Sequence, residues 1–218
     1  ERTSLISTSS AACLSVPDAS LDYVFLDPPF GSNIIYSDLS FIWEAWLSLA
    51  TNLDAEAVVH RRKKHGALSL DEYSHLMRDC FKRVHAALKP GRWMTVEFSN
   101  TRASVWNAIQ SALQEAGFVV ANVAALDKQM GSFKAVTTTT AVKQDLVISA
   151  YKPNGGLEER FEKTGHTPEG VWDFMKTHLR NLPVVKPRGG ELEFIAERDP
   201  RILYDRMVAF YVGHGVPV

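Results

Sequence analysis

Two consecutive prolines, Pro28 and Pro29, limit what the first apolar segment of the chain can form. They follow residues 22–27 (DYVFLD), and proline neither donates to a sheet ladder nor continues a helix. The segment therefore predicts a short buried strand with Asp27 at its carboxyl end. Because ligands of open α/β sheets bind beyond the carboxyl ends of the strands, Asp27 is a candidate site residue.

Helix and strand signals alternate after these prolines, which predicts an α/β fold with a mainly parallel sheet and helices on both faces. Ser69 is the expected N-cap of a helix that ends at Lys89-Pro90-Gly91. Asn100 or Thr101 is the expected N-cap of a second helix, which ends at Gly117. The apolar stripes of these helices comprise Leu76, Cys80, Val84 and Leu88 in the first and Val105, Ile109, Leu113 and Ala116 in the second. Further strands are expected at 93–98, 118–123 and 146–151.

The character of the sequence changes after the linker at residues 152–156 (KPNGG). Two isolated helices are expected beyond it, one beginning at Thr167-Pro168 and the other at Asp199-Pro200 and ending at Gly213. We therefore expect a main domain at 1–153 and a small helical extension at 154–218.

The composition is that of an ordinary globular protein, with 45% hydrophobic and 22% charged residues and no apolar run near the roughly 18 residues of a membrane span. Cys13 and Cys80 are too few for a disulfide framework or a four-ligand zinc site, which favours a reducing cytoplasm. Because the net charge is only -1, a nucleic-acid partner would need a local basic patch. The run 60–65 (HRRKKH) is the candidate, and its alternative is a solvated loop.

Asp27, the Pro28 carbonyl and the Phe30 ring form a set that suits a planar amine. The two oxygens can accept hydrogen bonds from an exocyclic NH2 group, while the ring stacks on the heterocycle that carries it. Stacking of a base on an aromatic ring contributes about 1 to 3 kcal/mol and tolerates any base. This chemistry requires no metal. The alternative is that Asp27 only caps the turn after its strand.

Other residues near this strand end are weaker candidates. Asn33, Tyr36 and Asp38 are possible pocket residues, and Glu97, Ser99 and Asn100 follow the next strand and border the same cleft. The apolar residues between the prolines and residue 46 recur at helical spacing and are expected to lie mostly in the core. They are Ile35, Leu39, Ile42, Trp43 and Trp46.

The segment "DPPFG" after "LDYVF" resembles the D/N/S-P-P-Y/F motif of amino-group methyltransferases that use S-adenosylmethionine, above all DNA adenine-N6 and cytosine-N4 enzymes. Four longer segments resemble successive elements of large adenine-specific DNA methylases found beside bacterial defence systems. They are "DPPFGSNIIYSDLSFIWEAWL", "ALKPGRWMTVEFSN", "VWNAIQSALQEAGF" and "AVKQDLVISAYKP", and the similarity covers about residues 3 to 153.

The resemblance implies a partial Rossmann-like class I methyltransferase sheet, mainly parallel with a terminal antiparallel strand. It implies that residues 93–98 form the strand beside 22–27, and that 118–151 form the terminal hairpin. The motif residues would be Asp27, Pro28, Pro29 and Phe30. They would act on a DNA base that has been flipped out of the duplex, and its amino nitrogen would take the methyl group directly. Phe30, Asn33, Tyr36 and the basic residues Arg61, Arg62, Lys63 and Lys64 would contact the DNA.

The sequence contains no strand, glycine-rich turn and helix of the kind with which such enzymes bind the methionine part of the cofactor. The resemblance then implies the second half of a catalytic domain, the first half being truncated, on another chain or lost, and the start without Met fits this expectation. Ser10, Asp27 and Gly31 would border the S-adenosylmethionine site. Expected partners are DNA and the missing half or another copy of the chain, which would associate through the uncovered edge of strand 22–27, and no membrane.

Two other functions remain open. The first is methylation of a guanine amino group in ribosomal RNA, because enzymes of that kind also have "FLDPPF" at this strand end, although the Trp-rich segment after the motif argues against it. The second is a fragment or subunit that binds nucleic acid or another chain and transfers no methyl group.

Replacing Arg61, Arg62, Lys63 and Lys64 by Ala should weaken binding to all DNA sequences alike. Each neutralised phosphate releases counterions, so the slope of log affinity against log salt should flatten by about 0.9 for every phosphate that the variant no longer neutralises. Filter binding or fluorescence anisotropy over a salt series measures this slope. If the variant keeps the parent's slope, residues 60–65 form a solvated loop and do not bind phosphates.

Overall fold

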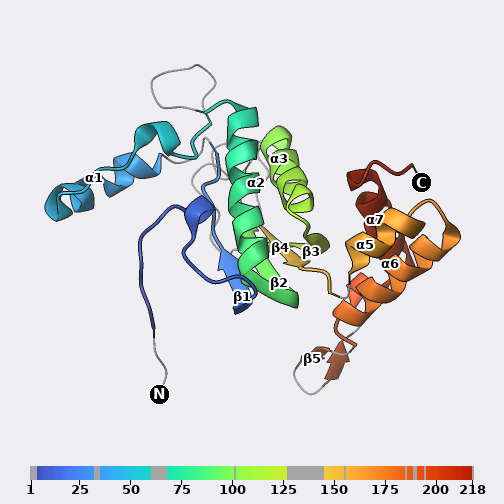
Figure 1. Cartoon of the computed structure of the whole chain (residues 1–218). Coiled ribbons are helices and arrows are strands. Elements are labelled where there is room, and N and C mark those ends of the chain that lie inside the picture. Colours follow the sequence, from blue (N-terminus) through green and yellow to red (C-terminus); the bar gives the residue numbers. More distant parts are fainter. Residues whose placement is uncertain are drawn as a thin grey trace.

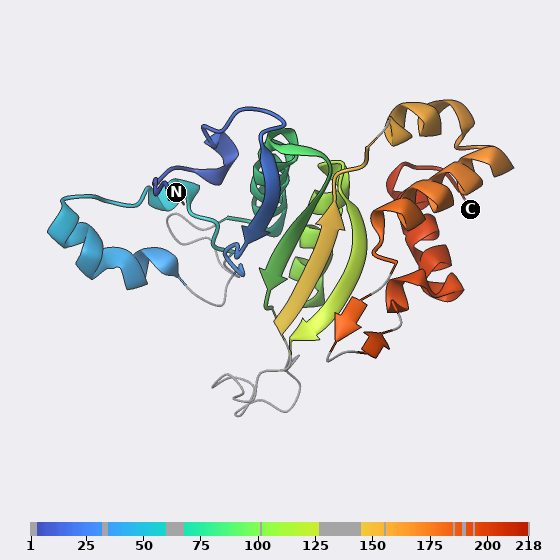
Figure 2. The same ribbon diagram turned by 90° about the horizontal axis from the view of Figure 1, so that it is seen from below.

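The computed structural model describes residues 4–31, 35–59, 68–100, 102–126, 145–154, 156–184, 186–188, 191–193 and 195–217. Its centre is a four-stranded sheet in the order β1-β2-β4-β3 (Figures 1 and 2). The strands are β1 (Leu21–Leu26), β2 (Leu88–Phe98), β3 (Val119–Leu126) and β4 (Asp145–Tyr151).

The strand directions confirm the predicted α/β class. β1 and β2 are parallel, and β4 lies between β2 and β3 and is antiparallel to both. Three strands of this sheet, β1, β2 and β3, therefore run in one direction, and β4 runs in the other. The expected pairing of 22–27 with 93–98 and the hairpin within 118–151 are both present.

β1 is an edge strand of this sheet, and the prediction of a buried strand was wrong, because none of its residues is fully buried. Val24 and Leu26 pack against the main core, whereas Tyr23 and Phe25 point to the opposite face and are more than half exposed. The Tyr23 hydroxyl donates to the Thr95 Oγ1 atom of β2 at 2.7 Å. An all-apolar run cannot tell an edge strand from a central one, because it contains no signal for what covers each face.

Helix α2 (Leu70–Ala87) covers one face of the sheet, and the Ser69 N-cap predicted for it is confirmed (Figure 1). Ser69 and Glu72 form a reciprocal capping box, which satisfies two otherwise free N–H groups. The predicted stripe is confirmed at Val84 and Leu88, which are buried, and was wrong at Leu76 and Cys80, which are only partly buried. The buried residues of the helix are Tyr73, Met77, Phe81, Val84 and Ala87.

Helix α3 (Ala103–Glu115) packs beside α2 on the same face, and its predicted stripe of Val105, Ile109, Leu113 and Ala116 is buried. Its N-cap is Arg102, so the prediction of Asn100 or Thr101 was wrong. The Asn100 side chain instead accepts a hydrogen bond from the Arg102 backbone N–H at 2.8 Å. Gly117 ends the helix with φ +91°, as predicted.

The described residues after 156 form three α-helices, and not two. The start of α6 (Pro168–Asn181) and both bounds of α7 (Pro200–Gly213) agree with the prediction, while α5 (Leu157–Thr164) was missed. α5 has only two buried apolar residues, Leu157 and Phe161, so its pattern is too short to detect. A short hairpin, β5 (Lys186–Arg188) with β6 (Glu191–Glu193), separates α6 from α7.

The C-terminal helices are not isolated, because they share a core with the sheet face opposite to α2 and α3. Phe174 of α6 and Met207 of α7 belong to the same cluster as Val119 and Ala121 of β3 and Tyr151 of β4. Figure 2 shows these helices beside the β3 end of the sheet. They leave the β1 side of that face uncovered, which explains the exposure of Tyr23 and Phe25. The division at residue 153 stays a prediction.

Helix α1 (Tyr36–Leu47) projects from the β1 side of the molecule (Figures 1 and 2). None of its residues is buried, so the prediction that Leu39, Ile42, Trp43 and Trp46 lie in the core was wrong. A helical repeat of apolar residues requires some partner surface, but it does not say that the partner is the chain's own core.

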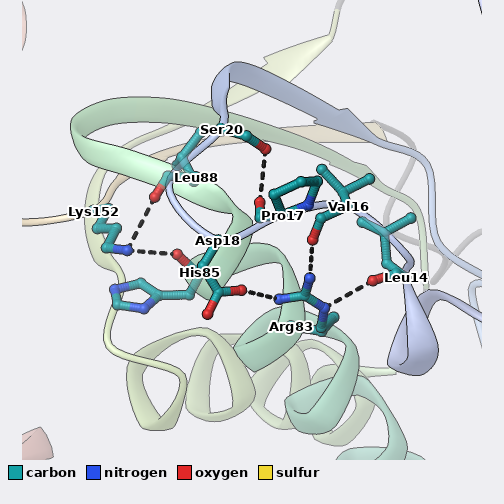
Figure 3. A network of polar contacts seen from close by, with 9 residues as sticks. All are labelled: Leu14, Val16, Pro17, Asp18, Ser20, Arg83, His85, Leu88 and Lys152. Atoms are coloured by element: carbon teal, nitrogen blue, oxygen red, sulfur yellow. Dashed lines mark hydrogen bonds and ion pairs between the residues drawn. The ribbon is translucent and has the colours of Figure 1, made fainter.

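Arg83 of α2 attaches the N-terminal segment to the body (Figure 3). Its guanidinium donates to the Leu14 carbonyl at 2.8 Å, to the Val16 carbonyl, and to the Asp18 carboxylate at 2.6 Å. Nearby, Lys152 donates to the His85 and Leu88 carbonyls at 2.8 and 3.0 Å and satisfies the carboxyl end of α2. These contacts hold the segment that carries Ser10 against α2.

His178 lies fully buried in the C-terminal core. Its Nδ1 atom is 2.8 Å from the Tyr151 hydroxyl, and its ring stacks on Phe174 with centroids 5.5 Å apart. Burial, and secondarily the positive charge of Arg206, lower the pKa of His178 to about 4. The folded protein therefore holds this imidazole neutral at pH values where the unfolded chain protonates it.

The free energy of unfolding should fall as the pH is lowered from about 6.5 to about 4, because only the unfolded state takes up this proton. His178→Gln should flatten this dependence by up to about 1.4 kcal/mol per pH unit. Urea unfolding at several pH values, followed by circular dichroism, measures the slope. His166→Gln, at an exposed position, is the control and should keep the parent's slope. An unchanged slope in His178→Gln would contradict the assignment.

Candidate functional site

Asp27 follows β1 directly, and its side chain is exposed. Burial, and then the negative charge of Asp27, raise the pKa of Tyr36. The structure thus brings two predicted site residues, Asp27 and the first residue of α1, into electrostatic contact. Tyr36 stays protonated at neutral pH and can donate its hydroxyl hydrogen.

Two side chains from separate elements fix the loop after Asp27. The buried Tyr73 hydroxyl of α2 donates to the Pro29 carbonyl at 2.7 Å, and the Asn100 amide, just after β2, donates to the Phe30 carbonyl. Burial, and secondarily Tyr36, raise the pKa of Tyr73, so the phenol remains a donor. The sequence did not reveal Tyr73, because a tyrosine within an apolar stripe is usually a core residue.

Gly31 closes this loop in a conformation that favours glycine. Its φ is +82°, and it is buried. A Cβ atom at this position would lie 3.3 Å from Val105 Cγ1 and 3.4 Å from Asn100 Nδ2. Gly31 therefore serves the shape of the loop.

The Phe30 ring is half-buried and meets Phe98 of β2 edge to face, with centroids 5.6 Å apart. It packs against the main core, so part of its surface stabilises the fold. Its predicted stacking on a base stays a prediction.

A cavity of about 330 Å³ opens between the Asp27 loop, the N-terminal segment and α2. Ser10, Asp27 and Pro28 border it on one side, and Leu76 and Cys80 form part of the α2 wall. The other lining residues are Ala11, Leu26, Pro29, Ala55, Ala57, Met77, Phe81 and Val84. The walls are mainly apolar, with Asp27 and Ser10 as the polar residues among them. A flat, largely apolar ligand with a few hydrogen-bond donors would suit this cavity.

The cavity brings together two of the three predicted cofactor residues. Ser10 and Asp27 border it, while Gly31 does not. It also explains why Leu76 and Cys80 of α2 are only partly buried, because both residues line the cavity. Burial, as the largest cause, raises the pKa of Cys80 to about 11, so its thiol is neutral and acts as part of the apolar wall.

The remaining predicted residues are not at the cavity or cannot be placed. Met94, Val96 and Phe98 of β2 pack toward α2, so the alternating Glu97 points to the opposite face. Asp38 is exposed on α1. Asn33, Arg61, Arg62, Lys63 and Lys64 lie outside the described residues.

Among the described residues, no group of three or more His, Cys, Asp or Glu side chains could hold a metal ion. Within the same part of the chain, every helix is too short or too polar to span a membrane.

No protein-family model matches the chain, and no curated protein matches it significantly. Solved structures do resemble it. TTHA0409 of Thermus thermophilus, named as a DNA modification methylase and complexed with S-adenosyl-L-methionine, is 16% identical over 77% of this chain and 64% of its own, with a TM-score of 0.39. PvuII DNA methyltransferase, which is cytosine-N4-specific, is 16% identical over 80% of this chain and 61% of its own, with a TM-score of 0.40.

A third similar structure is the [4+2]-cyclase SpnF, 13% identical over 68% of this chain and 57% of its own, with a TM-score of 0.37. The chain spans 58% to 64% of the length of the TTHA0409 structures.

Tyr73→Phe should lower the free energy of unfolding by about 1 to 3 kcal/mol, because it leaves the Pro29 carbonyl without its donor. Urea denaturation followed by circular dichroism measures the change. Tyr204→Phe removes a hydroxyl from an exposed tyrosine and should have almost no effect. Equal stabilities of the two variants would show that this hydrogen bond does not hold the loop.

Proposed function

We propose that the chain takes part in methyl transfer from S-adenosylmethionine to the exocyclic amino group of a flipped DNA base, with adenine N6 as the target. On this proposal the chain is related to the large bacterial adenine-specific DNA methylases of restriction-modification or similar defence systems, and acts in the cytoplasm. The observation that carries the proposal is the Asp-Pro-Pro-Phe loop at the carboxyl end of β1, with Asp27 exposed at the rim of a cavity.

The loop geometry supports an acceptor role for Asp27. The carbonyls of Pro29 and Phe30 accept hydrogen bonds from Tyr73 and Asn100, so both carbonyls are engaged within the fold. The Asp27 carboxylate and the Pro28 carbonyl are the neighbouring acceptors that an amino group would meet. Two such hydrogen bonds raise the electron density on the amino nitrogen and orient its lone pair. The Phe30 ring would then contact the face of the base.

The cavity fits part of S-adenosylmethionine. Its volume of about 330 Å³ lies at the lower end of the range of small-molecule sites, roughly 300 to 1,000 Å³. Ser10 and Asp27 would bind polar groups of the cofactor, and Leu76 and Cys80 would contact its flat apolar part. Gly31 would act through the shape of the loop. When bound, the cofactor supplies a methyl group activated by a positively charged sulfur.

Asp27 has a further task in this reaction. The amino nitrogen would form a bond to the methyl carbon while the bond from that carbon to the cofactor sulfur breaks and leaves a neutral thioether. The nearby carboxylate would stabilise the positive charge that develops on the nitrogen, which would then release one proton to solvent. Base flipping costs a few kcal/mol, which contacts with Phe30 and Tyr36 would offset in part. A partner polypeptide, either the first half of a catalytic domain or another copy of the chain, belongs to the same proposal.

Asp27→Asn should lower the rate of methyl transfer by about 10²-fold or more, because it removes the negative charge beside the reacting nitrogen. The assay follows radiolabelled methyl groups on duplex DNA, with ribosomal RNA as the alternative substrate, with and without the partner polypeptide. Cofactor affinity, measured by calorimetry, should change much less, because asparagine keeps a side-chain oxygen that can still accept a hydrogen bond from the cofactor. Asp54→Asn, at another exposed aspartate, is the matched control and should keep the parent's activity.

The outcomes distinguish the three functions. Methylation of DNA that depends on Asp27 supports the proposal, whereas methylation of ribosomal RNA alone would favour the guanine enzyme. Binding of nucleic acid without methyl transfer under any of these conditions would favour the non-catalytic subunit.

A further inference from the structure

Helix α1 presents an unusual amount of apolar surface. Trp46 is 77% exposed, Leu47 67%, Leu39 65%, and Ile42 and Trp43 62% each. The rings of Trp43 and Trp46 meet edge to face with centroids 5.6 Å apart and form a continuous ridge. Large side chains of this kind, when they gather in one place on a protein surface, mark an interaction site.

Polar contacts at both ends hold α1 in place. At its start, the backbone N–H and the hydroxyl of Ser37 donate to the Glu56 carboxylate at 2.9 and 2.7 Å. At its end, the Thr51 N–H donates to the Glu44 carboxylate at 3.1 Å, and the Thr51 hydroxyl donates to the same carboxylate. These contacts join both ends of the helix to the segment that follows it, while its large apolar side chains stay exposed, including Phe41 at 68% on the other side of the helix.

The apolar residues Leu39, Ile42, Trp43 and Trp46 have the spacing i, i+3, i+4, i+7, so they lie along one side of the helix. At 100° per residue, Asp38 and Glu44 lie away from the middle of this stripe. The middle of a seam formed by the stripe would therefore contain no charged side chain, and Asp38 would lie at its edge. We call these four residues, together with Leu47, the α1 stripe.

The size of the α1 stripe matches one side of a protein–protein interface. A large aromatic side chain has a surface of about 150 to 250 Å². With the exposed fractions given above, the residues of the stripe together expose on the order of 600 Å² of apolar surface. One partner in a standard interface contributes about 800 Å², and the largest patch on a typical monomer is about 300 to 600 Å².

The charges of α1 argue against an anionic occupant. The helix contains Asp38 and Glu44 and neither lysine nor arginine. Nucleic acids and anionic membrane surfaces are bound through basic residues beside the apolar or aromatic ones. The chemistry of the stripe therefore fits a protein surface.

We propose that the α1 stripe pairs with the same stripe of a second copy of this chain, with the two helices antiparallel. The four stripe positions are symmetric about the point between Ile42 and Trp43. In an antiparallel pair, Leu39 meets the Trp46 position of the other copy and Ile42 meets its Trp43 position. Each tryptophan then packs on an aliphatic side chain, and both copies use the same surface, as a two-fold axis requires.

This proposal is independent of methyl transfer, and its test measures only association. Sedimentation velocity over a concentration series should show a monomer–dimer equilibrium for the chain. Trp46→Glu and Trp43→Glu should each raise the dissociation constant at least about thirtyfold, the effect of a hot-spot residue. Trp172→Glu is the matched control, since Trp172 is 64% exposed on α6, and it should leave the dissociation constant unchanged. Circular dichroism checks that each variant is folded.

Disulfide trapping tests the orientation of the helices. In a background with Cys13→Ser and Cys80→Ala, Ile42→Cys lies near the two-fold axis and should form a covalent dimer on oxidation. Leu39→Cys should not, because its symmetry mate lies about seven residues, or roughly 10 Å, away along the helices. An Ile42→Cys dimer without a Leu39→Cys dimer supports the antiparallel pair, and the opposite pattern overturns it.

Several results would overturn the proposal as a whole. The first is a parent chain that stays monomeric over the whole concentration series. The second is a dimer whose dissociation constant does not rise in Trp43→Glu and Trp46→Glu. The third is a dimer that Trp172→Glu weakens as much as these two variants do. A monomeric parent whose binding to duplex DNA or to anionic vesicles is lost in Trp46→Glu would also overturn it and would assign the stripe to that ligand.

Discussion

The hydrogen bond from Tyr73 to the Pro29 carbonyl joins the core of the molecule to its candidate site. Tyr73 belongs to the buried stripe of α2, so the packing that positions α2 on the sheet also positions this donor. Asn100, just beyond β2, holds the next carbonyl in the same way. The loop after β1 thus takes its shape from two elements that are fixed elsewhere. A change in the packing of α2 would move the acceptors at Asp27 even though it touches no site residue.

The features predicted correctly from the sequence are those that local chemistry determines. The capping box at Ser69, the stop at Gly117 and the proline starts of α6 and α7 each depend on a few adjacent residues. The position of Asp27 at a strand end follows in the same way from the two prolines. The meeting of Ser10 with Asp27 at one cavity was expected only from the resemblance. Tyr73 could not be found, because its role depends on a contact 44 residues away in sequence.

The features predicted wrongly depend on what covers a surface. β1 and α1 both have apolar patterns that suggest burial, yet Phe25 and Trp46 are exposed. Hydrophobic periodicity shows which side of an element avoids water, and it does not identify the surface that will cover that side. The same reasoning explains why the C-terminal helices were expected to be isolated. Their partner is the far face of the sheet, which a linker signal at residues 152–156 cannot reveal.

The position of Cys80 gives the cavity a chemical reporter of its own. Only the thiolate form of a cysteine reacts with alkylating reagents, and burial keeps this thiol protonated at neutral pH. Cys13, the other cysteine, is exposed at the surface. Alkylation should therefore proceed in two phases, with Cys13 labelled first and Cys80 only as reagent enters beside Asp27. That rate depends on both the small thiolate fraction and the entry of the reagent, so its changes at a fixed pH report how freely the cavity admits small molecules, without knowledge of its natural ligand.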